Sequence, residues 1–219
     1  PSLPQSEKDR LEELFKSYPN VFAHGKRILG TIKDHVFDIK LTINLSEHRS
    51  KLQKKAYPAS PQRRYDIEKN INELLEMGVI ERVKVVPKGS IVSHVLISYE
   101  DNGKARMCGD FRVLNSYTVT HTHPMPRINE IPTNLAGAER IATLDCNKGY
   151  HQMMNTEQAS WYMLIICHDG VFRYLRMPFG PKNAPAYYQQ CMDETFKVEI
   201  QQGWLTVYID DLIIASKSN

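Results

Sequence analysis

The 219-residue sequence has few cysteines, no long apolar run and no internal repeat. Its four cysteines lie far apart without a Cys-x-x-Cys pair, so neither a cysteine-based zinc site nor a disulfide framework is indicated. No apolar run approaches the roughly 18 residues of a membrane span. The N-terminus also lacks the basic-then-apolar pattern of a signal peptide. These absences favour a soluble protein in a reducing, intracellular compartment.

Charge is nearly balanced overall but is concentrated locally. The 28 Lys and Arg against 25 Asp and Glu give a net charge of +3, which neither demands nor excludes a polyanionic partner. One short stretch is strongly basic, and two interpretations of it stay open: a solvated surface or a surface that faces phosphates. Its basic residues are Arg49, Lys51, Lys54, Lys55, Arg63 and Arg64.

Helical and strand patterns alternate along the chain, which is typical of an α+β fold. The helix that we expect at residues 6–17 has Ser6 and Asp9 as its N-terminal cap, and the one at 63–77 has Gly78 as its C-terminal cap. Further helices are expected at residues 127–135 and from Asn183 onward. Strands are expected at residues 36–41, 79–86, 91–99, 105–111, 141–146, 162–167 and 171–175, with the segment 79–111 forming two or three antiparallel strands beside a helix.

Two β-rich apolar runs between Leu205 and Ala215 meet at Asp210 and Asp211, which predicts a hairpin with two carboxylates at its tip. An ordinary solvated turn is the simpler interpretation, because Asp tolerates turn geometry. Strands this apolar are normally buried on both faces, however, and two like charges held beside a core repel each other unless a cation lies between them.

Asp145 also ends an apolar strand. If that strand is the neighbour of the hairpin, three carboxylates converge into an oxygen-only set that suits magnesium or manganese and does not suit zinc. Such sites typically hold two ions about 4 Å apart and catalyse phosphoryl transfer. His121 and His123 lie in a Pro-rich connection, where we expect them to be exposed and not to bind a metal.

Four ordered motifs resemble those of reverse transcriptases. Tyr208-Ile209-Asp210-Asp211 resembles the Tyr-x-Asp-Asp signature, and Thr143-Leu144-Asp145 with Gly149-Tyr150-His151-Gln152 resembles the first catalytic motif. The other two are Met177-Pro178-Phe179-Gly180 with Asn183-Ala184-Pro185, and Arg106 with Cys108, Asp110-Phe111-Arg112 and Leu114-Asn115. The sequences of these motifs are most similar to those of the polymerases of gypsy-type LTR retrotransposons.

The resemblance implies an RNA-directed DNA polymerase that transfers a nucleotide from a dNTP to a primer 3′-hydroxyl on an RNA or DNA template. The implied fold is the fingers and palm of a right-hand polymerase, with an antiparallel palm sheet packed on helices and no thumb. Residues 1–45 would form an N-terminal helix and lead-in segment, residues 46–137 mainly the fingers, and residues 138–219 mainly the palm.

The chain begins at Pro1 without Met and stops at Asn219, so we expect a piece of a longer protein. By the resemblance, its partners are the RNA or DNA template-primer, dNTP, and the thumb, connection, RNase H and integrase parts of a Pol polyprotein. No membrane is implied. The implied location is the cytoplasm, in a virus-like particle, or the nucleus.

The resemblance also implies a role for individual residues. Two Mg²⁺ ions, with Mn²⁺ as the alternative, would be held by the three catalytic carboxylates Asp145, Asp210 and Asp211 and by the Cys146 carbonyl. Tyr150 would exclude a 2′-hydroxyl, and Arg106 would bind the triphosphate. Phe179, Gly180 and Tyr208 would also contact the substrate. Arg112, Lys54, Lys55, Arg63 and Arg64 would contact nucleic acid, although Arg112 could equally be the ion-pair partner of Asp110.

Three departures from the family pattern bear on activity. Glu100 and Asp101 stand where relatives usually carry lysines, which would weaken triphosphate affinity unless Lys104 compensates. Residues 85–90 lack the usual Ser-Pro-Trp-like segment, and Pro181 replaces an aliphatic residue. A repurposed fragment that binds nucleic acid without catalysis is therefore an alternative. A two-metal nuclease is another, but it gives no reason for Tyr150.

Overall fold

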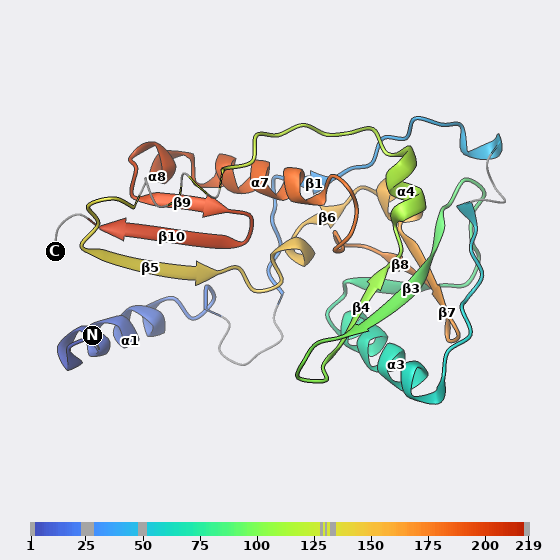
Figure 1. The fold of residues 1–219 in the computed structure, drawn as a ribbon, viewed down its shortest axis with the longest axis horizontal. Helices are drawn as coiled ribbons and strands as arrows, with labels where there is room; N and C mark the ends of the chain where they lie inside the picture. The colour runs from blue at the N-terminus through green and yellow to red at the C-terminus, as the bar shows by residue number, and fades with distance from the viewer. Residues whose placement is uncertain are drawn as a thin grey trace.

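The computed structural model of the chain describes residues 3–22, 29–47, 52–127, 129, 131 and 135–216. Besides the two-stranded pair β1-β6, the described residues form a three-stranded sheet, here the smaller sheet, and a five-stranded sheet, here the larger sheet. Figure 1 shows these two at opposite ends of the molecule, joined by helices and long connections. The elements are α1 Gln5–Ser17, β1 Val36–Phe37, η1 Leu45–Glu47, α3 Pro61–Glu76, β2 Ile80–Val83, β3 Val92–Tyr99, β4 Ala105–Gly109, α4 Arg112–Tyr117, β5 Arg140–Asp145, η3 Gly149–Gln152, β6 Met154–Asn155, α6 Glu157–Tyr162, β7 Leu164–Cys167, β8 Gly170–Tyr174, α7 Ala184–Thr195, α8 Lys197–Gln201, β9 Leu205–Tyr208 and β10 Asp211–Ser216.

The smaller sheet is antiparallel, with strand order β5-β10-β9, and α7 and α8 lie against it (Figure 1). Leu205 and Val207 of β9 are buried, as are Tyr188, Cys191 and Met192 of α7. The expectation that the two strands around the aspartate pair are buried on both faces is wrong, because β9 alternates between buried and half-buried residues and only Ala215 of β10 is buried. All six residues of the edge strand β5 are exposed.

The larger sheet has strand order β2-β8-β7-β3-β4. The predicted hairpins β3–β4 and β7–β8 are both confirmed as antiparallel pairs. β2 and β3 do not pair with each other, so of the two or three antiparallel strands expected for residues 79–111 only β3 and β4 form a pair. The β7–β8 hairpin lies between β2 and β3, so that β2 pairs antiparallel with β8 and β3 pairs parallel with β7. This pairing joins segments far apart in the sequence, which local patterns do not reveal.

Helix α3 packs on the larger sheet much as its sequence predicts. Ser60 caps its start, because the Ser60 hydroxyl accepts a hydrogen bond from the Arg63 amide. Ile67 and Ile71 are buried, and each contributes roughly 2 kcal/mol through the burial of its side chain. Gly78 follows the helix with a φ of +64°, a left-handed conformation that favours glycine.

The N-terminal segments agree with expectation only in part. Ser6 and Asp9 lie inside α1, whose N-cap is Pro4, and no side chain caps the helix. Within residues 36–41 only β1 is a strand, and it pairs parallel with β6. Phe37 and Ile39 are nevertheless buried, as the alternating pattern indicates. Most of the helix expected at residues 127–135 lies outside the described residues.

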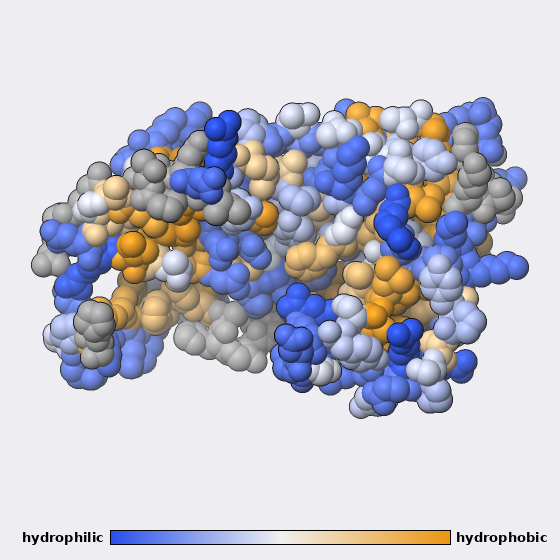
Figure 2. All heavy atoms as spheres, viewed as in Figure 1, coloured by the Kyte–Doolittle hydropathy of each residue, from blue (hydrophilic) through white to orange (hydrophobic). Residues whose placement is uncertain are grey.

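One hydrophobic cluster contains side chains from both sheets, including Ile67 of α3, Ile165 of β7, Tyr188 of α7 and Leu205 of β9. The two ends therefore share a core. Figure 2 shows apolar surface over the end that holds the smaller sheet, where Ile141, Leu144 and Trp204 are exposed. Among the helices of the described ranges, none has the length and apolar composition needed to cross a membrane.

Candidate active site

The register of the smaller sheet brings three aspartates together. Asp211, the first residue of β10, is paired with Asp145, the last residue of β5. Directly opposed residues in antiparallel strands have Cα atoms roughly 4.5–5.5 Å apart. The Cys146 amide donates a 2.8 Å hydrogen bond to the carbonyl oxygen of Asp210, which ties the hairpin to the end of β5. The prediction that the strand of Asp145 lies beside the aspartate pair is confirmed.

The turn of this hairpin is strained. Tyr208 pairs with Asp211, so the two turn residues are Ile209 and Asp210 and not the two aspartates expected. Ile209 has a φ of 55°. A β-branched residue is rarely found at positive φ, and such a conformation costs roughly 1–3 kcal/mol unless the surroundings impose it. The turn therefore needs anchors, and the Cys146–Asp210 hydrogen bond is one.

Gln189 of α7 is the second anchor. Its side chain is fully buried, and its Oε1 accepts a 2.7 Å hydrogen bond from the Ile209 amide. Its Nε2 donates to the Val207 carbonyl at 3.3 Å and to Asp193 Oδ1 at 2.8 Å. Sequence reasoning missed Gln189. The sequence offered little signal, because Gln189 is followed by a second glutamine, Gln190, and resembles one more polar position of the helix.

The electrostatics of the carboxylates favour a cation. Burial, and then the negative charges of Asp145 and Asp211, raise the pKa of the Asp210 carboxyl. The donor set is oxygen-only and suits a hard divalent ion. Within the ranges that the structure describes, however, no three His, Cys, Asp or Glu side chains are gathered closely enough to hold a metal. The residues fit such an ion by chemistry and backbone position, without a preformed side-chain cluster.

Tyr150 lies in η3 and is largely buried. Its ring stacks on Phe179, with centroids 4.8 Å apart, and lies 5.2 Å from the ring of Tyr188. Burial, and then Asp210 and Tyr208, raise the pKa of Tyr150 to about 12. The structure thus brings Tyr150 and Phe179 into contact and places both beside the hairpin.

Two glycines permit this packing. A Cβ on Gly149 would collide with the Tyr188 hydroxyl, and the Cys146 Cβ would lie 3.4 Å away. Gly180 has a φ of +106°, and a Cβ there would lie 3.2 Å from the ring of Phe111. At both positions an aromatic side chain lies so close to the backbone that a residue with a side chain would not fit.

The two arginines expected to bind substrate and template are both ion-paired. Arg106 on β4 pairs with Glu100 across the β3–β4 hairpin. Arg112 holds Asp110 through two hydrogen bonds of 2.7 and 2.6 Å, so the alternative of a structural ion pair is confirmed. The guanidinium groups of both remain exposed, with 72% and 81% of their side-chain surfaces accessible.

The basic segment is only partly described, since Arg49 and Lys51 lie outside the described residues. Lys54 is half-buried, and its amide donates to the Val92 carbonyl at 3.1 Å. Lys55 and the two arginines at the start of α3, Arg63 and Arg64, are exposed. None of these residues adjoins the aspartates through a described hydrogen bond or ion pair.

His121 and His123 are half-buried and bonded to α7, contrary to the expectation that they are exposed. His121 Nε2 lies 2.9 Å from Gln190 Oε1, and His123 Nε2 lies 2.7 Å from Asp193 Oδ2. Their partners come from a helix far along the chain, so the Pro-rich composition around them was a poor guide.

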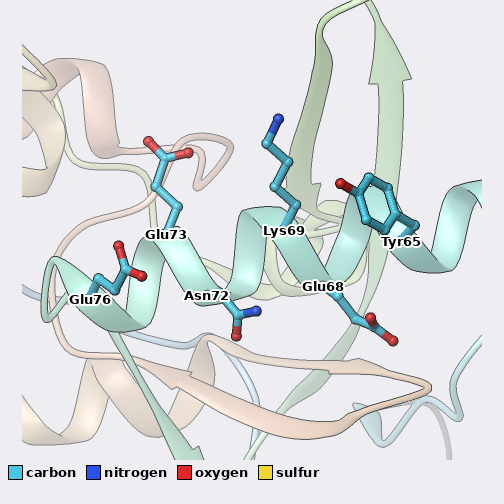
Figure 3. Close-up of a pocket in the computed structure, with 6 residues that line it drawn as sticks. All are labelled: Tyr65, Glu68, Lys69, Asn72, Glu73 and Glu76. Atoms are coloured by element: carbon cyan, nitrogen blue, oxygen red, sulfur yellow. The ribbon is translucent and has the colours of Figure 1, made fainter.

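Lys148 links the carboxylate region to α3. It follows the Asp145 motif with a φ of 51°, and its Nζ lies 2.9 Å from Glu73 Oε1. Figure 3 shows Glu73 on the face of α3 that also carries Tyr65 and Glu76. The hollow drawn there is lined by α3 alone and includes none of the expected catalytic or substrate-binding residues.

A model of the family described as "Reverse transcriptase (RNA-dependent DNA polymerase)" matches residues 86–219. The chain belongs to the reverse transcriptase family. It is 31% identical, over 99% of its length, to the Retrovirus-related Pol polyprotein from transposon 297 of Drosophila melanogaster, of which it covers 20%. It is 27% identical, over 95% of its length, to the Transposon Tf2-3 polyprotein of Schizosaccharomyces pombe, of which it covers 15%.

The chain thus spans a fifth or less of these two curated relatives. Among solved structures, it matches the prototype foamy virus protease–reverse transcriptase with a TM-score of 0.81, at 22% identity, over 99% of this chain and 28% of that one. It also matches a foamy viral protease–reverse transcriptase in complex with an RNA/DNA hybrid, with a TM-score of 0.82 at 19% identity, again over 99% of this chain and 28% of that one. These likenesses confirm the predicted α+β fingers-and-palm fold.

The division into residues 46–137 and 138–219 stays a prediction. Strands β7 and β8 belong to the second range by number but lie in the sheet with β2, β3 and β4.

Proposed function

We propose that this chain is the fingers and palm of a reverse transcriptase from the Pol polyprotein of a gypsy-type LTR retrotransposon. It extends a primer on an RNA or DNA template by nucleotidyl transfer from dNTP. The observation that supports this most is the pairing of Asp145 with Asp211 beside a turn that carries Asp210. Because the chain belongs to the reverse transcriptase family, the chemistry proposed for these aspartates is nucleotidyl transfer.

Asp145, Asp210 and Asp211 would hold two divalent cations, Mg²⁺ or Mn²⁺, together with the carbonyl oxygen of Cys146. That oxygen already accepts a 3.0 Å hydrogen bond from the Gly149 amide and keeps a second lone pair. When bound, the cations supply activation of the attacking hydroxyl and charge neutralisation at the phosphates. Burial, and then the negative charges of Asp145 and Asp211, raise the pKa of Asp210, and both effects favour a cation there.

The remaining residues would position the substrate. The ring of Tyr150 would fill the space that a 2′-hydroxyl needs, with Phe179 holding it from the loop before α7. Gly180 and Tyr208 would line the nascent base pair. Arg106 would bind the triphosphate once its guanidinium leaves Glu100, because its planar fork suits paired contacts to phosphate.

The nucleic acid would lie against basic side chains of the fingers. Arg112, Lys54, Lys55, Arg63 and Arg64 are the residues proposed to contact it. The thumb, connection, RNase H and integrase parts of a Pol polyprotein would be its covalent partners. Residence in a cytoplasmic virus-like particle or in the nucleus remains a proposal.

Primer extension on an RNA template with Mg²⁺ tests the function. The chain is compared with the Asp210→Asn plus Asp211→Asn variant, each alone and joined to a thumb domain. A matched control is Glu12→Gln plus Glu13→Gln, which neutralises two adjacent acids on the exposed helix α1. We expect weak, non-processive synthesis from the chain alone, more with a thumb, and none in the aspartate variant.

Synthesis that is equal in the aspartate variant and in the control would refute the assignment. Template-primer binding with no incorporation in any form would instead favour a module that binds nucleic acid without catalysis. Mg²⁺ binding, measured by calorimetry in the absence of substrate, provides a second readout. It should be lost in the aspartate variant and retained in the control.

A further inference from the structure

We infer that His123 and Asp193 are positioning residues, which hold the catalytic turn through the buried amide of Gln189. The inference rests on the proposed function, because it concerns the turn that carries Asp210. A single hydrogen-bonded chain runs from the connection before β5, across α7, to the backbone of Ile209.

The contacts of this chain are short and consecutive. His123 Nε2 lies 2.7 Å from Asp193 Oδ2. The other oxygen, Asp193 Oδ1, accepts a 2.8 Å hydrogen bond from Gln189 Nε2. Gln189 Oε1 then accepts a 2.7 Å hydrogen bond from the Ile209 amide. The side chains of Asp193 and Gln189, in the middle of this path, are therefore each bonded on both sides.

The orientation of the Gln189 amide decides whether the turn is anchored. An amide side chain has one accepting end and one donating end, and the Ile209 amide needs the accepting end. The donating end must then face the Val207 carbonyl and Asp193. An ionised carboxylate can only accept, so Asp193 permits this orientation and disfavours the reversed one. A neutral Asn at position 193 would accommodate both.

His123 fixes the carboxylate in turn. The side chain of Asp193 is one-third exposed, so solvent alone would let it adopt several rotamers. The segment that carries His123 is itself bound to α7: Asn183 Nδ2 donates to the Val119 carbonyl at 2.7 Å, and Asn183 Oδ1 accepts from the His121 amide at 3.1 Å. This connection thereby holds His123 against the helix.

The turn is the element in the site that needs such support. Ile209 is held at positive φ, a conformation that persists only where the surroundings impose it. Without the Gln189 hydrogen bond, the turn would relax, and Asp210 would move relative to Asp145. Loss of the hydrogen bonds that link His123, Asp193 and Gln189 to Ile209 should therefore affect the chemical step more than the binding of dNTP.

Amide hydrogen exchange of the peptide that contains residues 205–212 tests the inference without metal or substrate. In Asp193→Asn we expect the Ile209 amide to exchange roughly tenfold faster, since one buried hydrogen bond to it is weakened. His123→Ala should produce a smaller increase. Glu194→Gln is the matched control, because Glu194 lies on the same helix but bonds to Gln190 and His35.

Equal protection of Ile209 in Asp193→Asn and Glu194→Gln would overturn the inference. If Asp193→Asn unfolds α7 as a whole, His123→Ala decides the outcome, since it removes only the outer contact. Protection of Ile209 in His123→Ala that equals the protection in the unmodified chain would then reject the role of the pair.

Single-nucleotide incorporation supplies the functional readout. We expect kcat to fall roughly tenfold in Asp193→Asn, with KM for dNTP unchanged, because one hydrogen bond that shapes the catalytic turn is weakened. The double variant with His123→Ala should be no slower than Asp193→Asn alone. Additive losses, or a change in KM only, would contradict a shared path. If neither the parent nor any variant incorporates nucleotide, the proposed polymerase function is refuted. The hydrogen-exchange experiment then still tests whether His123 and Asp193 position the turn.

Discussion

The rings of Tyr150 and Phe179 lie close to parallel, with 4.8 Å between their centroids and 22° between their planes. Tyr150 is largely buried, whereas half of the Phe179 surface is exposed. A residue that follows β5 is thus held by the loop that precedes α7. The proposed gate and the loop expected to face the nascent base pair therefore form one aromatic surface.

This contact leads to a prediction about sugar selection. Tyr150→Ala should raise the use of rNTP relative to dNTP by roughly tenfold or more, because removing the ring opens the space for a 2′-hydroxyl. Tyr150→Phe is the matched control and should keep the selectivity. Burial raises the pKa of Tyr150 to about 12, so its hydroxyl is neutral at assay pH. Incorporation from a mixture of dNTP and rNTP measures the ratio. An unchanged ratio in Tyr150→Ala would refute the role of Tyr150 in sugar selection.

Gly149 should not tolerate a side chain. Gly149→Ala places a methyl group against the Tyr188 hydroxyl, and we expect a loss of about 1–3 kcal/mol in the free energy of unfolding. Adding Tyr188→Phe should recover part of this loss, because the nearest atom is removed. Gly30→Ala is a control in which the new methyl meets only the flexible end of Gln152. Urea unfolding measures all four proteins, and equal stability of the two alanine variants would contradict the clash.

The ionised carboxylate of Asp210 should lower the free energy of unfolding of the metal-free protein at neutral pH. Its folded-state pKa is raised above 3.8 by burial and by Asp145 and Asp211, so folding disfavours the ionised carboxylate. The folded state binds the proton more tightly, and the cost is therefore present above the raised pKa and disappears as the pH falls toward 3.8.

Asp210→Asn should consequently stabilise the metal-free chain at pH 7, and the gain should shrink in acid. Thermal unfolding between pH 3.5 and 8 in the presence of a chelator gives the measurement. Asp101→Asn, in the exposed turn between β3 and β4, controls for loss of a negative charge elsewhere. A gain at pH 7 that persists unchanged in acid would show that the like-charge explanation is wrong.

Glu100 should compete with the triphosphate for Arg106. The hydrogen bond from Arg106, followed by one from Asn102, lowers the pKa of the Glu100 carboxyl, which stays ionised at neutral pH. Glu100→Gln should lower KM for dNTP about two- to fivefold with kcat unchanged, the size expected for an exposed ion pair. Asp101→Gln in the same turn provides the control. Steady-state incorporation measures both constants, and a KM that does not fall would assign Glu100 no such role.

Local patterns in the sequence were sufficient for elements whose signals are local. The spacing of Ile67 and Ile71, with Gly78 after the helix, predicted α3 closely, although the helix begins two residues earlier, behind a Ser60 cap that was not predicted. The β3–β4 hairpin followed from the Asp101-Asn102-Gly103 turn. The placement of Asp145 beside Asp211 was also predicted, because each ends or begins an apolar strand.

Features that depend on distant contacts were not predictable in this way. The insertion of β7 and β8 between β2 and β3 is a matter of tertiary pairing. Gln189 reads as one more polar position on a helix until its burial beneath the hairpin is known. The turn at Ile209 was misplaced by one residue, since propensity assigns a turn to Asp-Asp and not to a β-branched residue.

The two-residue turn between Tyr208 and Asp211 has a consequence for how this family can vary. Side chains alternate between faces along a strand, so a shift of the pairing register of β10 by one residue would move every one of its side chains to the opposite face. The carboxylate of Asp211, at the start of β10, would then point away from the carboxylate of Asp145, at the end of β5. An insertion or deletion in the turn that shifts this register would therefore separate Asp145 from Asp211.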